Sequence, residues 1–206
     1  MNIVVIDLGI SNLSSLCNCL NFLGAKFQIS NNKNTLDKAS HIILPGVGSF
    51  DEFIKAITKA DLIESLKHKV LIKSIPILGI CIGLQVLLKK SEEGKSKGLG
   101  FINGEVKKLS LSKKKYFKVP NVGFAQLSNF KKNNLFKNLE KSDAFYFMHS
   151  YACYKIYDNL VSCAYSKHNT NFIAAFQKKN ICGFQFHPEK SQTSGLKLLK
   201  NFLEIK

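Results

Sequence analysis

Apolar and polar positions in the first half of the chain follow two alternating patterns. Short continuous apolar runs predict buried strands at residues 2–8, 26–30, 41–46 and 75–80. Between these runs, apolar residues recur with helical spacing, which predicts a helix that ends at Gly24 and helices over residues 49–70 and 83–93. Ser49 is a suitable N-cap for the second of these helices. Alternating strands and helices predict a mainly parallel sheet with helices on both faces.

The pattern changes after about residue 98, where strand-like segments rich in aromatic residues follow one another. Turn residues separate these segments, which lie at residues 98–109, 114–127, 143–154, 161–166, 172–180 and 181–190. A helical pattern returns only at residues 194–205. Because no linker or internal repeat interrupts the chain, we expect one domain over residues 1–206. It would be of the α/β class, with antiparallel strands added in its C-terminal half.

The composition is that of an ordinary globular protein, with 206 residues of which 45% are hydrophobic. The longest apolar stretch, residues 75–88, is interrupted by Pro76 and Gln85, so it is a poor candidate for a membrane span. The N-terminus lacks the basic region and cleavage site of a signal peptide. We therefore expect a cytoplasmic protein whose six cysteines are reduced thiols.

The formal net charge of +16 would suit a nucleic-acid-binding protein, but the kind of basic residue does not. The lysines are not accompanied by a single arginine, which is the usual bidentate ligand of phosphates and base edges. The lysines are scattered, and their densest run, Lys113–Lys115, falls in a predicted loop. We therefore expect no nucleic-acid partner, and no membrane partner either.

The hexapeptide GICIGL places Cys81 between two glycines, each two residues away. It joins a predicted strand to a predicted helix, and the missing side chains at Gly79 and Gly83 suit a sharp turn. This is the arrangement of a nucleophile elbow, with cysteine in place of serine. A helix N-terminus would also favour the reactive thiolate. The alternative is a buried, inert cysteine, because cysteine is among the most buried residue types.

A candidate base for this nucleophile is His187, at the end of an alternating, strand-like segment. Glu189 lies two residues further on, and that offset places both side chains on one face of an extended chain. Pro188 between them favours extended geometry at His187. Glu189 would then orient His187 and stabilise its protonated form. The alternatives are a solvent-exposed turn and a His-x-Glu metal pair, but no third metal ligand with clear spacing is present.

The segment LPGVGSF, residues 44–50, is a candidate source of backbone N–H groups for an oxyanion. Its glycines follow a predicted strand and would let N–H groups point into a pocket. An ordinary strand-to-helix turn would have the same composition. The segment lacks the Lys-Ser/Thr of a P-loop, and DLGISN at residues 7–12 lacks the spacing of a dinucleotide-binding motif.

Together these motifs resemble the class I (triad) glutamine amidotransferases. Matching segments occur in the same order along nearly the whole chain, as LPGVGSF, LGICIGLQ, FMHSY and QFHPEKS. The resemblance is strongest to the glutaminase subunits of imidazole glycerol phosphate synthases, whose opening and ending are similar to IDLGISNLSS and GLKLLKNFLE here. It implies a flavodoxin-like fold and hydrolysis of L-glutamine to L-glutamate and ammonia, without a cofactor or a metal.

The resemblance also implies roles for individual residues. Cys81 would attack the side-chain amide of glutamine, and a thioester would form. His187 would protonate the leaving ammonia and later activate water, while Glu189 would hold His187. The family's remaining contacts fall on the oxyanion donors Val47, Gly48 and Ile82 and on the substrate contacts Gln85, Ser150 and Tyr151.

The resemblance further implies a partner protein. In this family the ammonia passes into a barrel-shaped cyclase subunit of a heterodimer, which makes imidazole glycerol phosphate and AICAR in histidine biosynthesis. Ligand on the cyclase switches glutamine hydrolysis on. This chain departs from the family at residues 120–125, which read PNVGFA where those subunits carry a PHMGWN-like segment. The alternative is therefore a paralogous glutaminase that supplies ammonia to a surface-polysaccharide sugar amidotransferase.

The sequence leaves two further classes of function open. A catalytically inactive binding module would keep the fold, but the intact Cys81, His187 and Glu189 favour an enzyme. A cysteine peptidase would also place its nucleophile on an elbow, but Gln85 and the HSY segment favour glutamine as the substrate.

Overall fold

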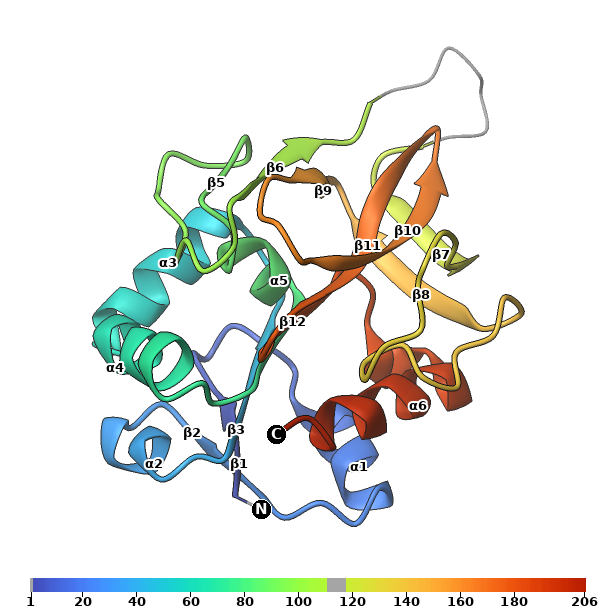
Figure 1. The fold of residues 1–206 in the computed structure, drawn as a ribbon. Helices are drawn as coiled ribbons and strands as arrows, with labels where there is room; N and C mark the ends of the chain where they lie inside the picture. The colour runs from blue at the N-terminus through green and yellow to red at the C-terminus, as the bar shows by residue number, and fades with distance from the viewer. Residues whose placement is uncertain (1, 111–117) are drawn as a thin grey trace.

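The computed structural model describes residues 2–110 and 118–206, and it places one large sheet between two layers of helices (Figure 1). The predicted loop at Lys113–Lys115 lies outside the described residues. The strands of the N-terminal half are β1 (Ile3–Ile6), β2 (Phe27–Ser30), β3 (His41–Gly46) and β4 (Ile77–Cys81). Its helices are α1 (Ser14–Phe22), α2 (Lys33–Asp37), α3 (Phe50–Lys59), α4 (Ile63–Lys67), the π-helical turn η1 (His68–Ile72) and α5 (Ile82–Val86).

The C-terminal half consists mainly of strands, as the sequence predicted. These are β5 (Lys90–Ser91), β6 (Gly104–Lys108), β7 (Asn121–Gln126), β8 (Ala144–His149), β9 (Tyr151–Ile156), β10 (Ser162–His168), β11 (Thr170–Lys178) and β12 (Ile181–Phe184). The short 3-10 helix η2 (Pro188–Lys190) and the helix α6 (Gln192–Leu203) complete the chain.

The large sheet has the strand order β2-β1-β3-β4-β12-β11-β9-β6-β5, and β10 pairs with β11. The five strands from β2 to β12 are parallel to one another. Antiparallel pairing begins where β11 joins β12 and continues through β9 and β6. The predicted class, α/β with a mainly parallel centre and added antiparallel strands, is confirmed. A separate antiparallel pair, β7–β8, lies beside the large sheet (Figure 1).

Side-chain alternation along β1 explains why helices cover both faces of the sheet. Ile3 and Val5 belong to one buried cluster, which also contains Leu16 of α1 and Phe202 of α6. Val4 and Ile6 belong to a second buried cluster, which contains apolar side chains of α3, α4 and α5. Successive residues of a strand point to opposite faces, so a fully apolar strand needs cover on both. In Figure 1, α1 and α6 accordingly lie on one side of the sheet and α3 and α4 on the other.

The predicted helix over residues 49–70 is wrong in extent, because it is divided. Ser49 caps α3 as predicted, and its side chain and that of Glu52 form a reciprocal capping box. The first helix ends at Lys59, however, since Asp61 adopts a positive φ of 53° that a right-handed helix cannot contain. The chain then forms α4 and the π-helical turn η1.

The predicted helix over residues 83–93 is also wrong in extent, since α5 ends at Val86. The loop around Gly98 uses carbonyl groups at the end of the helix and just after it. Leu99 N donates to Val86 O at 2.7 Å, and Gly98 N donates to Lys89 O at 2.8 Å. A Cβ atom on Gly98 would lie 2.0 Å from Leu88 O, so only glycine permits this approach. The helix α2 was not predicted. It begins at an Asn32 cap that accepts from Asn34 N.

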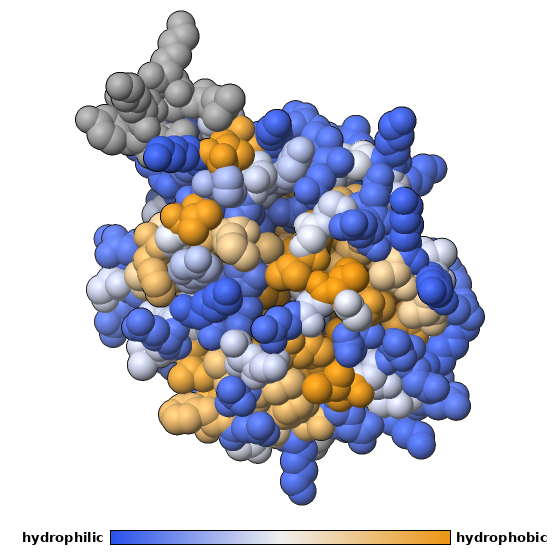
Figure 2. Space-filling model, turned by 180° about the vertical axis from the view of Figure 1, so that it is seen from behind, coloured by the Kyte–Doolittle hydropathy of each residue, from blue (hydrophilic) through white to orange (hydrophobic). Residues whose placement is uncertain are grey.

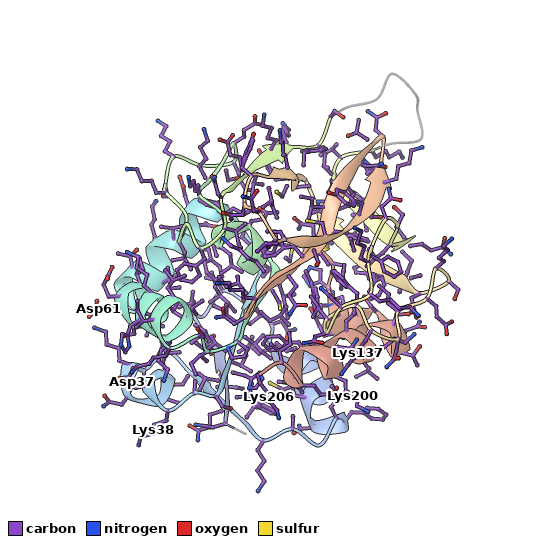
Figure 3. All side chains as sticks on the ribbon, viewed as in Figure 1. Asp37, Lys38, Asp61, Lys137, Lys200 and Lys206 are labelled. Carbon is purple, nitrogen blue, oxygen red and sulfur yellow. The ribbon has the colours of Figure 1, made fainter. Side chains whose placement is uncertain are left out.

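Charged side chains are spread over the outside of the molecule. Figure 3 labels Lys38, which follows α2, on one side of the molecule, and Lys137 and Lys200 on the other. Figure 2 shows apolar side chains gathered in small patches between hydrophilic ones on the opposite side. Among the described residues, no helix combines the length and the apolar character needed to cross a bilayer.

Candidate active site

Cys81 is the last residue of β4 and the N-cap of α5, so it lies at the turn between strand and helix. Its backbone has φ 54° and ψ −109°, a strained conformation for a residue with a Cβ atom. The flanking glycines permit the turn by their lack of a side chain. A Cβ atom on Gly79 would lie 2.4 Å from Gly83 O, and one on Gly83 would lie 1.8 Å from Leu44 O. The GICIGL motif therefore forms the predicted elbow.

The elbow lies at the carboxyl ends of the central parallel strands. Gly46 at the end of β3 is the register partner of Cys81, and on the other side Phe184 of β12 pairs with Ile80. This edge is where open α/β sheets bind ligands, because the loops after neighbouring strands converge there. His187, three residues after the end of β12, is thereby brought close to a cysteine more than a hundred residues earlier in the chain.

The His187 side chain is held in place by Glu189. Nδ1 of His187 lies 2.8 Å from Oε1 of Glu189, and the His187 side chain is only 4% exposed. The main chain is fixed as well, since His187 N donates to Tyr146 O at 2.9 Å and Ser191 Oγ donates to His187 O at 2.6 Å. A carboxylate oxygen accepts, so Nδ1 carries a hydrogen and Nε2 is the nitrogen left for proton transfer.

Electrostatics favour a protonated His187. Burial lowers the pKa of His187, but the hydrogen-bonding and Coulomb interactions with Cys81 and Glu189 outweigh burial and raise it well above 6.5. Nε2 is buried, and because Nδ1 faces Glu189, Nε2 is the ring nitrogen that can interact with the Cys81 thiol. An imidazolium beside a thiol is the arrangement that favours a reactive thiolate.

A cavity of about 90 Å³ opens over Cys81. It brings together all the residues predicted for the site except Glu189, which lies behind His187. They are Val47, Gly48, Cys81, Ile82, Gln85, Ser150, Tyr151 and His187. Gly48 in the predicted oxyanion loop has φ +95°, a conformation that favours glycine. The amide of Ile82, the first residue of α5, follows the nucleophile directly.

The cavity is also lined by Glu93, Met148 and His149, which were not predicted from the sequence. Glu93 lies two residues after β5, and its Oε2 accepts from Phe50 N at 3.0 Å. Burial raises the pKa of Glu93, although the Phe50 hydrogen bond opposes the shift. The position of Glu93 in the cavity depends on where α5 ends, which the helical pattern did not predict.

The missed His149 is a neutral histidine with both ring nitrogens engaged. Nδ1 lies 2.9 Å from Tyr151 O, and Nε2 lies 3.1 Å from Nδ2 of Asn121. A carbonyl can only accept, so Nδ1 donates and Nε2 accepts from the Asn121 amide. Burial lowers the pKa of His149 to about 4, with smaller contributions from His168 and His187. His149 therefore supports the Ser150–Tyr151 segment instead of supplying a charge.

Among the described residues, no group of His, Cys, Asp and Glu side chains is arranged to hold a metal ion. The site thus consists of a cysteine on a strained turn, a buried histidine paired with a carboxylate, and a small cavity whose lining includes Val47, Gly48 and Ile82. These are the parts of an acyl-transfer site with a cysteine nucleophile.

The chain belongs to the class I glutamine amidotransferase family. The family model described as "Glutamine amidotransferase class-I" matches residues 4–205. The predicted family and the predicted enzyme class are therefore confirmed, and the protein is a glutamine amidotransferase.

Among curated proteins, this chain is similar to one kind of subunit within the family. The chain is 39% identical to the "Imidazole glycerol phosphate synthase subunit HisH" of Leptospira interrogans, covering 98% of both chains. It is 41% identical to "Imidazole glycerol phosphate synthase subunit HisH 2" of Methanococcus maripaludis, again covering 98% of each. Among solved structures, PurLQS from Thermotoga maritima matches with a TM-score of 0.73 and 20% identity, over 98% of this chain and 97% of that one. A structure of a glutamine amidotransferase matches with the same TM-score at 17% identity, over 98% of this chain and 97% of that chain. These structures support the flavodoxin-like fold.

Proposed function

We propose that this chain acts as one domain in the cytoplasm and hydrolyses L-glutamine to L-glutamate and ammonia through a Cys81 thioester. The observation that carries the proposal is the convergence of the Cys81 elbow and the buried His187–Glu189 pair on one cavity. A hydrolysis of this kind needs a nucleophile, a proton carrier and oxyanion donors, and the cavity contains candidates for all of them.

In the first half of the proposed reaction, Sγ of Cys81 attacks the side-chain amide carbon of glutamine. The C–N bond breaks, and Nε2 of His187 gives its proton to the departing ammonia. In the second half, His187 takes a proton from water, whose oxygen attacks the thioester. The carbon–sulfur bond breaks, and glutamate and the Cys81 thiolate are released. Glu189 keeps Nδ1 of His187 in its donating form throughout.

The negative oxygen that forms at each step needs hydrogen-bond donors. Backbone amides of Val47 and Gly48 on one wall and of Ile82 at the start of α5 are the proposed donors. The free ends of the substrate would lie further out. Ser150 and Tyr151 are the proposed contacts of these ends, and Gln85 is a further proposed contact of the substrate.

We add Glu93 to these substrate contacts. Its carboxylate lines the cavity, and an α-ammonium group is the part of glutamine that a carboxylate would bind. Burial raises the pKa of Glu93 by disfavouring the charged carboxylate, and a bound cation would act in the opposite direction.

We further propose that a barrel-shaped cyclase subunit binds over this cavity and receives the ammonia for histidine biosynthesis, where it makes imidazole glycerol phosphate and AICAR. The full-length similarity to HisH subunits supports this partner. The outer face of the β7–β8 pair supports docking of the partner at this position. Val122, Phe124 and Met148 are 57%, 55% and 41% exposed, and Met148 also lines the cavity. Exposed apolar groups beside a site are typical of a docking surface.

The alternative is a glutaminase that serves a sugar amidotransferase of surface polysaccharides. The altered segment PNVGFA forms most of β7 and so lies on the surface proposed for docking. A change confined to that surface would alter the partner and leave Cys81, His187 and Glu189 unchanged.

The test is glutamine hydrolysis by this chain mixed with the cyclase subunit of its own organism. The mixture is assayed with and without the nucleotide substrate of the cyclase. We expect ligand-dependent stimulation that is lost in Cys81→Ala. Without a complex or stimulation, the histidine pathway is excluded, and the sugar amidotransferase becomes the partner to test. Stimulation that survives in Cys81→Ala would exclude the thioester mechanism.

A further inference from the structure

Gln185 is a fully buried amide side chain to which neither the motifs nor the proposed mechanism gives a role. Its residue is 0% exposed, and it directly follows β12. Its backbone N donates to Ala174 O at 2.8 Å, which continues the ladder to β11. Burying an amide is unfavourable unless the group is hydrogen-bonded, so its side-chain partners are informative.

The register of the sheet places Gln185 beside the nucleophile. Phe184 pairs with Ile80 in the parallel β12–β4 ladder, so the next residues along, Gln185 and Cys81, are neighbours. Nε2 of Gln185 lies 3.9 Å from Sγ of Cys81, within reach of an N–H···S hydrogen bond. The same residue is therefore two positions before His187 and in contact with the sulfur.

A hydrogen-bond network fixes which end of the Gln185 amide faces the sulfur. Nε2 of Gln85 donates to Tyr151 O at 3.0 Å and to Oε1 of Gln185 at 3.1 Å. The Tyr151 carbonyl can only accept, so the nitrogen of Gln85 must face it. That nitrogen needs an acceptor on its other side, which turns the oxygen of Gln185 toward Gln85. The NH₂ group of Gln185 is then directed to Cys81.

We propose that Gln185 is a catalytic residue that donates a hydrogen bond to the Cys81 thiolate, and this inference rests on the proposed function. The donor directs Sγ and stabilises its negative charge before attack and again when the thiolate leaves the thioester. A hydrogen bond to a charged sulfur is stronger than one to the neutral thioester sulfur. Gln185 therefore raises the fraction of thiolate that is available for attack, and it favours the breakdown of the thioester, in which the thiolate is the leaving group. It also couples the nucleophile to Gln85, a proposed substrate contact.

The test measures alkylation of Cys81 by iodoacetamide against pH, followed by mass spectrometry of the peptide that contains Cys81. The variants are Gln185→Met, which has a similar length but no donor, and Gln185→Glu, which has the same shape with an acceptor. We expect the midpoint of the pH profile to move upward by about one to two pH units in Gln185→Met, and further in Gln185→Glu. In the stimulated complex, we expect kcat to fall at least about 10-fold in Gln185→Met.

A matched control distinguishes this role from a structural one. Asn201 is also a buried amide, 3% exposed, whose Nδ2 donates to Leu135 O and Lys137 O away from the site. Asn201→Leu should lower the thermal midpoint but leave the alkylation profile unchanged. A Gln185→Met profile equal to the wild-type one would overturn the inference, whatever its thermal midpoint. If Gln185→Met does not fold, the alkylation profile of Gln185→Glu is compared with the wild-type profile instead.

The alkylation assay needs neither glutamine nor a partner, so it separates the two proposals. An upward shift in a chain that never hydrolyses glutamine would support the Gln185–Cys81 contact and reject the proposed function. Glutamine turnover with an unshifted alkylation profile would support the proposed function and reject the Gln185–Cys81 contact.

Discussion

At the scale of single residues, His187 is held from several directions at once. Glu189 fixes its ring, Tyr146 O fixes its backbone nitrogen, and Ser191 Oγ fixes its carbonyl. Gly195 in α6 leaves room for this turn, because a Cβ atom there would lie 1.9 Å from Pro188 O. A proton carrier must stay within hydrogen-bond reach of two successive reactants, so this rigidity serves both halves of the proposed reaction.

Glu189→Gln tests the electrostatic part of that arrangement. The change keeps the shape of the side chain but removes the negative charge that stabilises protonated His187. We expect kcat of the stimulated complex to fall by about 10²- to 10⁴-fold, with a smaller change in KM. Glu204→Gln removes an exposed carboxylate paired with Lys137 and should leave the rate unchanged. A Glu189→Gln rate within twofold of wild type would reject the role of Glu189.

The residues of the triad could be predicted from the sequence because each belongs to a local motif. The elbow glycines lie two positions from Cys81, and Glu189 lies two positions from His187. Gln185 carried a similar local signal, since it lies two positions before His187 on the same strand-like segment. The sequence does not say that the Gln185 nitrogen faces sulfur. That depends on Gln85 and on a carbonyl at Tyr151, which are distant in the chain.

At the scale of elements, β7 is tied to the wall of the active site. Asn121 at its start donates to His149 at the end of β8, and His149 donates to Tyr151 O. Tyr151 O also accepts from Gln85. A hydrogen-bonded series therefore runs from the altered segment to Gln85, in addition to the exposed apolar face that β7 presents.

The neutral His149 predicts a pH dependence of stability. Its folded pKa of about 4 lies below the ordinary value of 6.5, so between these pH values the unfolded chain binds more protons. The His149 contribution is therefore fully present above pH 6.5 and is lost as the pH falls toward 4. The loss is on the order of 3 kcal/mol. His187, whose pKa is raised, acts in the opposite direction, and its contribution is lost as the pH rises above 6.5.

Urea unfolding at pH 7 and at pH 5 measures this effect. His149→Gln replaces the ring with an amide that does not titrate, so we expect a smaller difference in unfolding free energy between the two pH values than in wild type. His68→Gln changes an exposed histidine and should retain the wild-type difference. Equal differences in wild type and His149→Gln would show that His149 does not remain neutral in the folded chain.

Elements were predicted well where the local pattern decides them. The predicted strand at residues 41–46 coincides with β3, because a fully apolar run is buried on both sides. The helix ends were predicted poorly. The end of α5 is decided by the loop around Gly98, which takes its carbonyl groups, and the helical pattern continues past that point.

At the scale of the whole molecule, the topology joins distant motifs at one edge of the sheet. The parallel order β3-β4-β12 brings the LPGVGSF loop, Cys81 and the HPE segment together. The sequence predicted the strands but not their order. Hydrophobic pattern indicates that a strand is buried and does not indicate which strand lies beside it.

The exposed face of the β7–β8 pair gives the last prediction, which concerns assembly. Phe124→Lys places a flexible charge in the centre of the apolar face, so docking would require burying it. We expect the affinity for the cyclase subunit to fall by at least about 10-fold in titration calorimetry, with ligand-dependent stimulation lost in proportion. Phe22→Lys is the matched control. Phe22 is 78% exposed on α1, which Figure 1 shows below α6 and away from β7. Equal affinities for the two variants would mean that the partner docks elsewhere and that PNVGFA does not select it.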